Sequence, residues 1–257
     1  MKNVISRIMA VLLVCGMTAN ADAQKRETGE WSIIPRLGVN LSKLSGDKMW
    51  FGEDGSKCVN SSYKLGYEGG LDVEYMVHDR IGVTVGAMYA LLSEKFKDFH
   101  YADKAEGSDN LYKFSKYEDM RVNFGFLNVP VKCNVYLTDN FALKAGVQLG
   151  FMLSAKLKYN VVSGLYDRLN PGNIIYYDAD GNPAQDGSDV YLSEELDVKD
   201  GYKHFDISIP VGFSYEYENV ILEAQYRIGL SKLNLDGYAD KMHSSVFSIT
   251  VGYRLPL

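Results

Sequence analysis

The chain has 257 residues, of which 46% are hydrophobic, and its formal net charge is −6 at pH 7. An acidic chain lacks the basic surface that nucleic-acid binding requires, so nucleic acid is excluded as a partner. After the N-terminal segment no run of 18 consecutive apolar residues follows, so no transmembrane helix is expected in the rest of the chain.

Residues 1–23 have the pattern of a cleaved secretory signal peptide. Lys2 and Arg7 form a positively charged region ahead of an apolar stretch, and Ala21 and Ala23 form an A-x-A cleavage site. We therefore expect secretion, removal of this segment, and a single mature domain.

Eight segments of the predicted mature domain, 24–257, alternate apolar and polar residues with the period of two that is typical of β-strands. In chain order they are 31–41, 63–77, 81–95, 121–137, 141–158, 204–217, 220–231 and 245–257. In the fourth segment the alternation shifts by one residue near Phe126, which predicts a β-bulge. No helix is expected between the strands.

The connections between these segments alternate between long and short. The short ones lie around 78–80, 138–140 and 216–219, and the long ones are 42–62, 96–120, 159–203 and 232–244. This alternation is typical of an outer-membrane barrel, with tight periplasmic turns and long outer loops. We predict an all-β, eight-stranded antiparallel transmembrane up-and-down β-barrel in a Gram-negative outer membrane, with both termini in the periplasm.

The two faces of the strands differ in the way that a membrane barrel requires. One face carries Leu, Val, Ile, Phe and Tyr, whereas a soluble barrel of the lipocalin type would place its apolar face inside. Eight strands enclose room for side chains only, so we expect the inward charges to pair and fill the lumen. The alternative, that they line a narrow channel, is retained. The predicted lumen set is Arg36, Lys64, Glu68, Asp72, Glu74, Lys132, Lys144, Asp206, Glu223, Arg227 and Arg254.

Three further features of the sequence resemble functional sites. The Asp-Gly sequence at 180–181 follows an apolar run and favours a hairpin turn over a calcium loop, because Pro183 stands where an EF-hand needs Gly. The spacing of Cys58 and Cys133 fits no metal site and leaves their pairing open. His243 and Ser245 share one strand face, but a hydrolase needs a third, orienting partner. No catalytic residue, metal or cofactor is therefore expected.

The C-terminus carries an assembly pattern. Tyr253, Leu255 and Leu257 alternate outward as in the signal that the barrel-insertion machinery reads, although the usual last residue is aromatic. The segments 38–41, 126–132, 143–150, 222–230 and 247–254 resemble the Bacteroidetes-type outer-membrane β-barrel domain family, which includes PorT-like and so-called porin family proteins. The resemblance covers 31–257 and implies the barrel and its location. It implies no activity, and nothing in the sequence assigns the chain to type IX secretion, in which a few relatives serve.

The leading functional prediction is a non-enzymatic barrel. Its loops 42–62, 96–120 and 159–203 would present a binding, adhesion or structural surface, because rigid scaffolds commonly carry function on loops. The expected partners are outer-membrane lipid, lipopolysaccharide and the barrel-assembly machinery, while the surface ligand and the oligomeric state stay open. The alternatives are a narrow porin-like channel, a transport or secretion accessory, and a lipid A modifying enzyme.

Overall fold

The computed structural model describes residues 27–45, 48–51, 57–170, 172–178, 180–184, 192–233 and 242–257. The predicted signal peptide and its cleavage site at Ala21 and Ala23 lie outside the described residues.

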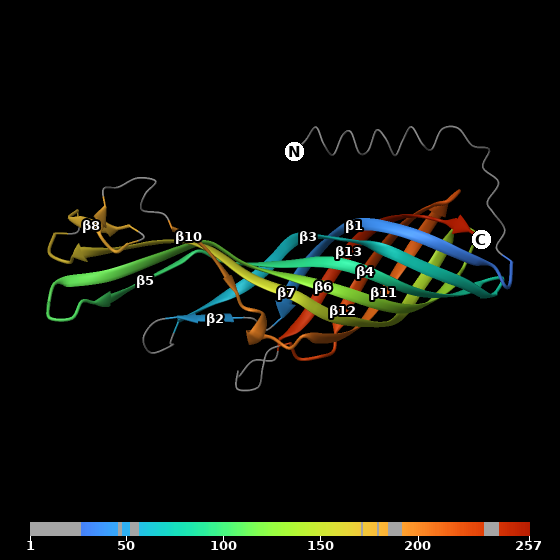
Figure 1. Cartoon of the computed structure of the whole chain (residues 1–257), viewed down its shortest axis with the longest axis horizontal. Helices are drawn as coiled ribbons and strands as arrows, with labels where there is room; N and C mark the ends of the chain where they lie inside the picture. Colours follow the sequence, from blue (N-terminus) through green and yellow to red (C-terminus); the bar gives the residue numbers. More distant parts are fainter. Residues whose placement is uncertain are drawn as a thin grey trace.

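Eight long strands form a closed ring (Figure 1). In chain order they are β1 (Trp31–Ser45), β3 (Lys57–His78), β4 (Ile81–Phe96), β6 (Leu111–Tyr136), β7 (Phe141–Asp167), β11 (Phe205–Tyr217), β12 (Val220–Gly229) and β13 (His243–Tyr253). Each strand pairs antiparallel with the next, and β13 closes the ring on β1 with Val39 opposite Ile249. Closure leaves no free edge, which hydrocarbon demands because each unpaired backbone group there costs several kcal/mol. The predicted eight-stranded antiparallel barrel is confirmed.

The short connections, the start of β1 and the C-terminus all lie on the same side of the barrel, which we call the turn end. Residues 79–80, 137–140 and 218–219 join consecutive strands there. The last strand, β14 (Leu255–Pro256), pairs with the first residues of β1, and the Leu257 amide donates to the Trp31 carbonyl at 2.9 Å. An even number of strands produces this arrangement.

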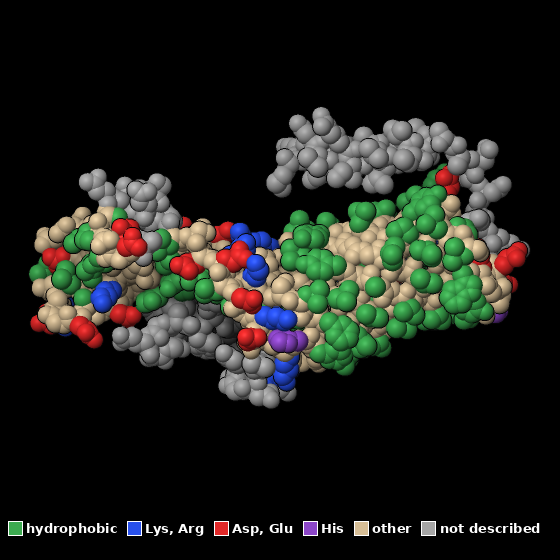
Figure 2. Space-filling model, in the orientation of Figure 1, with side chains coloured by type: hydrophobic (Ala, Val, Ile, Leu, Met, Phe, Trp, Pro, Cys, Tyr) green, Lys and Arg blue, Asp and Glu red, His purple; other side chains and the backbone are tan. Residues whose placement is uncertain are grey.

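The outward face of the barrel is an apolar belt, seen as the green surface in Figure 2. Leu37 on β1 is 71% exposed, and similar apolar side chains project from every strand of the ring, as Tyr67, Leu143 and Ile249 do. Water would not tolerate so continuous an apolar surface, whereas lipid requires one. Within the described residues no helix has the length and hydrophobicity to cross a membrane, and the helix there is the 3-10 turn η2 (Lys199–Gly201).

Two strands continue far beyond the belt and form an arm (Figure 1). A tilted membrane strand needs about 9–11 residues, whereas β6 has 26 and β7 has 27. Their outer halves, 111–118 and 160–167, pair with each other, and shorter strands extend that sheet. We define the arm as these halves with β5 (Phe99–Lys104), β8 (Ile174–Tyr177) and β9 (Pro183–Ala184), and call its end of the barrel the arm end.

The predicted loops 42–62, 96–120 and 159–203 are therefore wrong as loops over much of their length. The first contains β2 (Lys48–Phe51), which pairs with the start of β3. The third contains β10 (Leu192–Asp197), which pairs with 156–161 of β7 at the base of the arm. Outside the membrane both faces of a strand meet water, so the contrast between apolar and polar faces that marked the barrel strands is lost.

Two register shifts shape β6. The shift between Gly125 and Phe126 is the predicted bulge, which is confirmed. A second shift, between Glu118 and Arg121, contains Asp119 with a positive φ of 49°. Bulges bend a strand, and this one lies where β6 leaves the barrel for the arm.

The hairpin predicted at 180–181 is also confirmed. Residues of β8 and β9 pair across it, and Gly181 adopts a φ of 79°, which favours glycine. The Asp178 carboxylate accepts the amides of Asp180 and Asn182, so it is engaged in holding the turn.

The arm-end half of the lumen holds a compact apolar core. Its members are Leu44, Ala90, Leu92, Phe96, Met120, Val122, Phe124, Phe126, Met152, Ala155, Leu233, Met242 and Val246, all of them buried. The expectation that paired charges fill the lumen therefore fails in this half, because the inward face of β4 beyond Met88 is apolar except for Glu94, which is buried and accepts the Leu44 amide at 3.2 Å.

Candidate functional site

The centre of the lumen is a cluster of charges around Glu223. Arg36 donates to Glu223 at 2.6 Å and to Asp72 at 2.5 Å. Lys144 reaches the other oxygen of Glu223 at 2.7 Å, and Lys132 lies 3.2 Å from Glu223 and 3.4 Å from Asp72. Three cations on β1, β6 and β7 thus share two carboxylates on β3 and β12.

Glycine makes room for these large side chains. Gly252 stands opposite Arg36 in the register, and a Cβ at that glycine would lie 2.8 Å from Cγ of Arg36. Gly86 likewise faces Asp72, whose carboxylate would meet a Cβ there. The frequent inward glycines therefore have a packing reason, because an eight-stranded barrel cannot hold a side chain at every inward position.

A second group of charges fills the turn end. Arg254 donates to Glu74 at 2.5 Å and to Glu216 at 2.8 Å. Tyr136 donates to Glu74 at 2.8 Å, and Asn134 also donates to that carboxylate. Sequence reasoning missed Glu216 because it was assigned to a turn. The signal was present, since Glu216 continues the inward alternation of Asp206, Ser208, Gly212 and Ser214.

Toward the apolar core the remaining predicted charges are also partnered. Arg227 donates to Glu68 at 2.5 Å. Asp206 accepts the hydroxyl of Ser244 at 2.9 Å and that of Ser231. The structure therefore brings ten of the eleven predicted lumen residues inside the barrel, and each of the ten is between 1% and 8% exposed.

Lys64 does not join them. A register shift of β3 against β4 between Tyr63 and Tyr67 displaces it from the inward series. It lies at the arm end, above the apolar belt, where its electrostatic neighbours are Arg121, Asp119 and Lys95. The single-residue slip moves a side chain to a different environment, which strict alternation cannot foresee.

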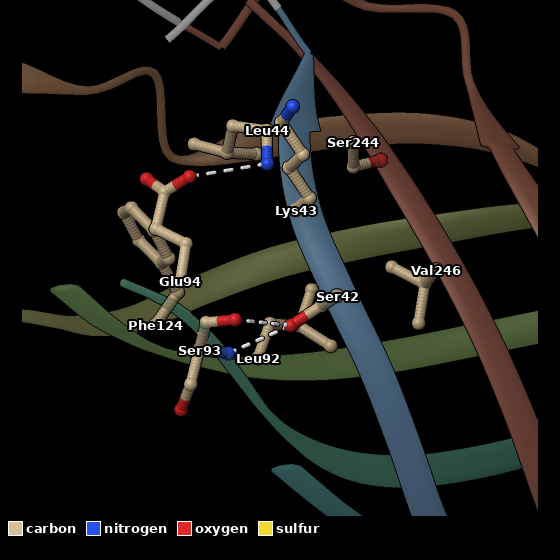
Figure 3. Close-up of a pocket in the computed structure, with 9 residues that line it drawn as sticks. All are labelled: Ser42, Lys43, Leu44, Leu92, Ser93, Glu94, Phe124, Ser244 and Val246. Carbon is tan, nitrogen blue, oxygen red and sulfur yellow. Dashed lines mark hydrogen bonds between the residues drawn. The ribbon is translucent and has the colours of Figure 1, made fainter. Parts of the chain in front are cut away.

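The lumen is filled along the length that these groups occupy. A water-filled pore would leave its lining charges accessible, whereas these are nearly fully buried and hydrogen-bonded to one another. At the border with the apolar core, a cavity of about 10 Å³ lies among Ser42, Leu92, Ser93, Phe124 and Val246 (Figure 3). That volume is at the lower limit for a single water molecule. Figure 3 also shows Ser42 and Ser93 closing a mutual hydrogen-bond pair beside it.

The Ser245 hydroxyl, considered above for catalysis, is held by tyrosines. It lies 2.7 Å from the Tyr226 hydroxyl and 3.1 Å from the Tyr63 hydroxyl on the outer surface of the barrel. Neither contact is with an imidazole that could take its proton, as nucleophilic catalysis requires. In the part of the chain that the structure describes, no group of three metal-ligating side chains occurs. Cys133 is an exposed free thiol, whereas the side chain of Cys58 lies outside the described residues.

The arm end also carries a cluster of charges outside the barrel, which we call the rim: Lys64, Lys95, Asp119, Arg121 and Lys158. Asp119 pairs with Lys95 at 2.9 Å and with Arg121 at 2.6 Å. Burial lowers the pKa of Lys64, and the nearby Arg121 lowers it further. Lys158 stands opposite Arg121 in the register and pairs with Glu195 of β10.

Comparisons with known proteins agree with this architecture. A family model described as "Outer membrane protein beta-barrel domain" matches residues 21–234. No curated protein matches the chain. Among solved structures, Ail, the attachment invasion locus protein of Yersinia pestis, is 16% identical with a TM-score of 0.38, covering 89% of this chain and 99% of Ail.

Two other solved structures are similar in the same degree. OprG from Pseudomonas aeruginosa is 14% identical with a TM-score of 0.38, covering 91% of this chain and 99% of OprG. The outer membrane protease OmpT from Escherichia coli is 10% identical with a TM-score of 0.33, covering 94% and 100%. Likenesses this distant transfer no activity. The match of the family model, together with the closed ring, shows that the chain belongs to the outer membrane protein β-barrel domain family and is an integral outer-membrane protein of the Gram-negative surface.

Proposed function

We propose that the protein is a non-enzymatic scaffold that presents its arm outside the cell as a binding or adhesion surface. The observation that carries this proposal is the continuation of β6 and β7 as a hydrogen-bonded sheet far beyond the apolar belt. Membrane anchoring needs none of that length. The filled lumen supports a scaffold rather than a conduit.

The composition of the arm supports a role in recognition. Phe114, Tyr166 and Tyr176 form a cluster of rings across β6, β7 and β8, and the ring centroid of Phe114 lies 6.3 Å from that of Tyr166 and 6.1 Å from that of Tyr176. Tyrosine-rich surfaces supply large contact area at low conformational cost and are enriched at protein interfaces.

A deletion that removes the arm and leaves the barrel tests the proposal. Residues 99–117 are excised with Asp98 joined to Glu118, because Phe99 and Tyr117 face each other in the register. Residues 161–191 are excised with Asn160 joined to Leu192 through Asn-Gly, because Asn160 faces Ser193 of β10. We expect the variant to assemble, as shown by the mobility difference between unboiled and boiled samples. Attachment of the producing bacteria to cultured epithelial cells should be lost.

A deletion of residues 235–240, in the fourth predicted loop, is the matched control, because it shortens a different connection at the same end of the barrel. It should leave attachment unchanged. Equal attachment with and without the arm would contradict the proposal, and so would failure of the armless barrel to assemble.

The alternative of a narrow channel predicts a different measurement. Protein refolded from residues 24–257 should be silent in a planar bilayer, because the charges of the lumen are paired and buried. Steady, ion-selective openings would overturn the scaffold proposal in favour of a pore or transport accessory. Unchanged lipid A masses in cells producing the wild type or Ser245→Ala would in turn agree with the absence of a lipid A modifying activity.

Several finer assignments belong to the same proposal. The signal peptide is cleaved after Ala23, and the turn end with both termini lies in the periplasm. The assembly machinery recognises Tyr253, Leu255 and Leu257. Lipopolysaccharide surrounds the barrel, and the chain belongs to the PorT-like branch of the family. The outward direction of the three C-terminal side chains supports the assembly signal. Mass spectrometry of the mature N-terminus and protease access to the arm on intact cells test the first two.

A further inference from the structure

We propose that the rim is a binding site for a phosphorylated lipid headgroup in the membrane leaflet next to the arm. This inference goes beyond the scaffold role, and it rests only on the orientation proposed above, with the arm outside. The depth of the rim, its excess of positive charge and its contrast with the turn end support the inference.

The rim lies at headgroup depth. The register of β4, β6 and β7 places Lys95, Arg121 and Lys158 side by side on three adjacent strands. The last outward apolar residue of β4 is Leu91, opposite Gly125, and the basic row follows four residues further along each strand. Figure 2 shows charged side chains gathered in a band between the apolar barrel surface and the arm. Long basic side chains at this depth can reach the phosphates while their stems stay in the apolar layer.

The rim holds more cations than its carboxylates neutralise. Lys64, Lys95 and Arg121 lie around the carboxylate of Asp119, and the Asp98 carboxylate, which accepts the Asp119 amide at 3.0 Å, is the second negative charge beside them, so three cations face two carboxylates. Within the residues that the structure describes, Lys64 forms no ion pair, and it feels the repulsion of both neighbouring cations. A folded protein lowers such repulsion by binding an anion, and phosphate oxygens accept several charge-assisted hydrogen bonds at once.

Neutral donors continue the site along the same edge of the barrel. Tyr63, next to Lys64 in the chain, and Tyr226 both reach the Ser245 hydroxyl, and Lys43 stands opposite Ser245 in the register of β1 and β13. Tyrosine rings at the border of lipid and water place the ring in lipid and the hydroxyl among headgroups. The donors of the site therefore extend over β12, β13, β1 and β3 toward the basic row.

The two ends of the barrel differ in charge. The turn end carries the carboxylates of Glu27, Glu30, Asp79, Asp139 and Glu218 together with the guanidinium of Arg80, so carboxylates outnumber this cation there. Anionic headgroups attract basic residues near their surface, with about 1 kcal/mol for each Lys or Arg, and repel acidic ones. This contrast indicates that the arm end faces the leaflet that is richer in phosphate. The ligand should be a lipid headgroup rather than soluble phosphate, because the row of Lys95, Arg121 and Lys158 borders the apolar belt directly.

Thermal unfolding of the full mature protein in detergent, with defined lipids added, tests the inference. Diphosphoryl lipid A should raise the midpoint of the gel-mobility transition for the wild type. Dephosphorylated lipid A and inorganic phosphate, at the same concentration, should not. The triple variant Lys64→Gln/Lys95→Gln/Arg121→Gln should lose the shift, with apparent affinity falling about fivefold for each cation removed.

Two variants keep the test specific. Lys104→Gln/Lys113→Gln/Lys116→Gln removes the same charge from the arm, away from the rim, and should bind lipid A as the wild type does. Asp119→Asn removes the carboxylate of the rim and should bind about fivefold more tightly. Asn tolerates the positive φ of that position, so its backbone should be kept.

Several outcomes of this experiment would contradict the inference. Equal protection of the wild type and the rim variant, or equal protection by both lipid A forms, would overturn the inference. Protection by inorganic phosphate would assign the site to a soluble anion instead. The armless deletion retains the rim, so loss of adhesion and loss of lipid binding are separable. An arm inaccessible to protease on intact cells would refute the orientation itself.

Discussion

The barrel and the arm share the same two strands, β6 and β7, but different forces hold them. In the barrel, lipid on the outside forces polar groups inward, and the interior is held by buried ion pairs such as Arg36–Glu223. In the arm, water reaches both faces, and the sheet is held by contacts between aromatic rings and by exposed ion pairs. The solvent, rather than strand propensity, therefore decides which interactions stabilise each half of one continuous strand.

The largest effect should come from Glu223→Gln in the barrel. The substitution leaves Arg36, Lys132 and Lys144 buried around a neutral amide, and removing one partner of a buried pair costs about 3–5 kcal/mol. Urea unfolding in lipid vesicles measures it. Glu194→Gln, on an exposed strand outside the barrel, is the control and should change little. A loss below about 1 kcal/mol for Glu223→Gln would mean that water enters the lumen and screens these charges.

The sequence predicted the barrel well and the arm poorly, for the same reason. Lipid imposes an alternation that can be read directly, as in Leu71, Val73 and Tyr75 against Asp72 and Glu74. In the arm, Tyr112 and Phe114 lie on one face and Tyr117 on the other, so no such contrast marks the strands. The prediction that Lys64 lies in the lumen was wrong because a register shift in β3 breaks the alternation.

The two halves of the lumen were also not equally predictable. The charged half was foreseen apart from Glu216, whose inward direction was hidden by its assignment to a turn. The apolar half was not, because Leu92 follows outward Leu91, and adjacent apolar residues carry no sign of which one points inward. Pairing distances depend on all eight strands together, and no single segment contains them.

The next largest loss of stability should come from adding a methyl group at a glycine that packs tightly against the neighbouring strand. A Cβ at Gly146 would meet the backbone carbonyl of Val131 and lie 2.7 Å from Cα of Lys132. Gly146→Ala should therefore destabilise the barrel by about 1–3 kcal/mol. Gly69→Ala is the matched control, since its nearest neighbour would lie at 3.4 Å. Equal unfolding midpoints for the two variants would show that β6 and β7 can separate without loss.

Substitution in the aromatic cluster of the arm should affect the arm alone. Phe114→Ala removes ring contacts with Tyr166 and Tyr176, and each aromatic pair contributes about 0.5–1.5 kcal/mol beyond its buried area. We expect faster hydrogen exchange in 111–118 and 160–167, with unchanged protection in the barrel strands. Exchange that rises equally in both regions would contradict the independence of the arm.

The smallest effect concerns the exposed ion pairs of Glu195 with Lys156 and Lys158 at the base of the arm, which we call the clamp. Lys156, which pairs with Glu195 at 2.6 Å, and Lys158 lower the pKa of Glu195 to about 2. A lowered pKa in the folded state means that this pairing stabilises β10 above the ordinary carboxylate pKa and is lost as the pH falls through about 2. At pH 4 the clamp should still be charged, whereas an unpaired glutamate would be largely protonated. NMR titration of the Glu195 carboxylate measures the midpoint, and Lys156→Gln/Lys158→Gln should raise it toward the ordinary value. Since the pair is exposed, 1 M salt should also raise the midpoint of the Glu195 titration. A midpoint that neither the substitutions nor the salt changes would show that contacts other than these lysines hold β10 against the barrel.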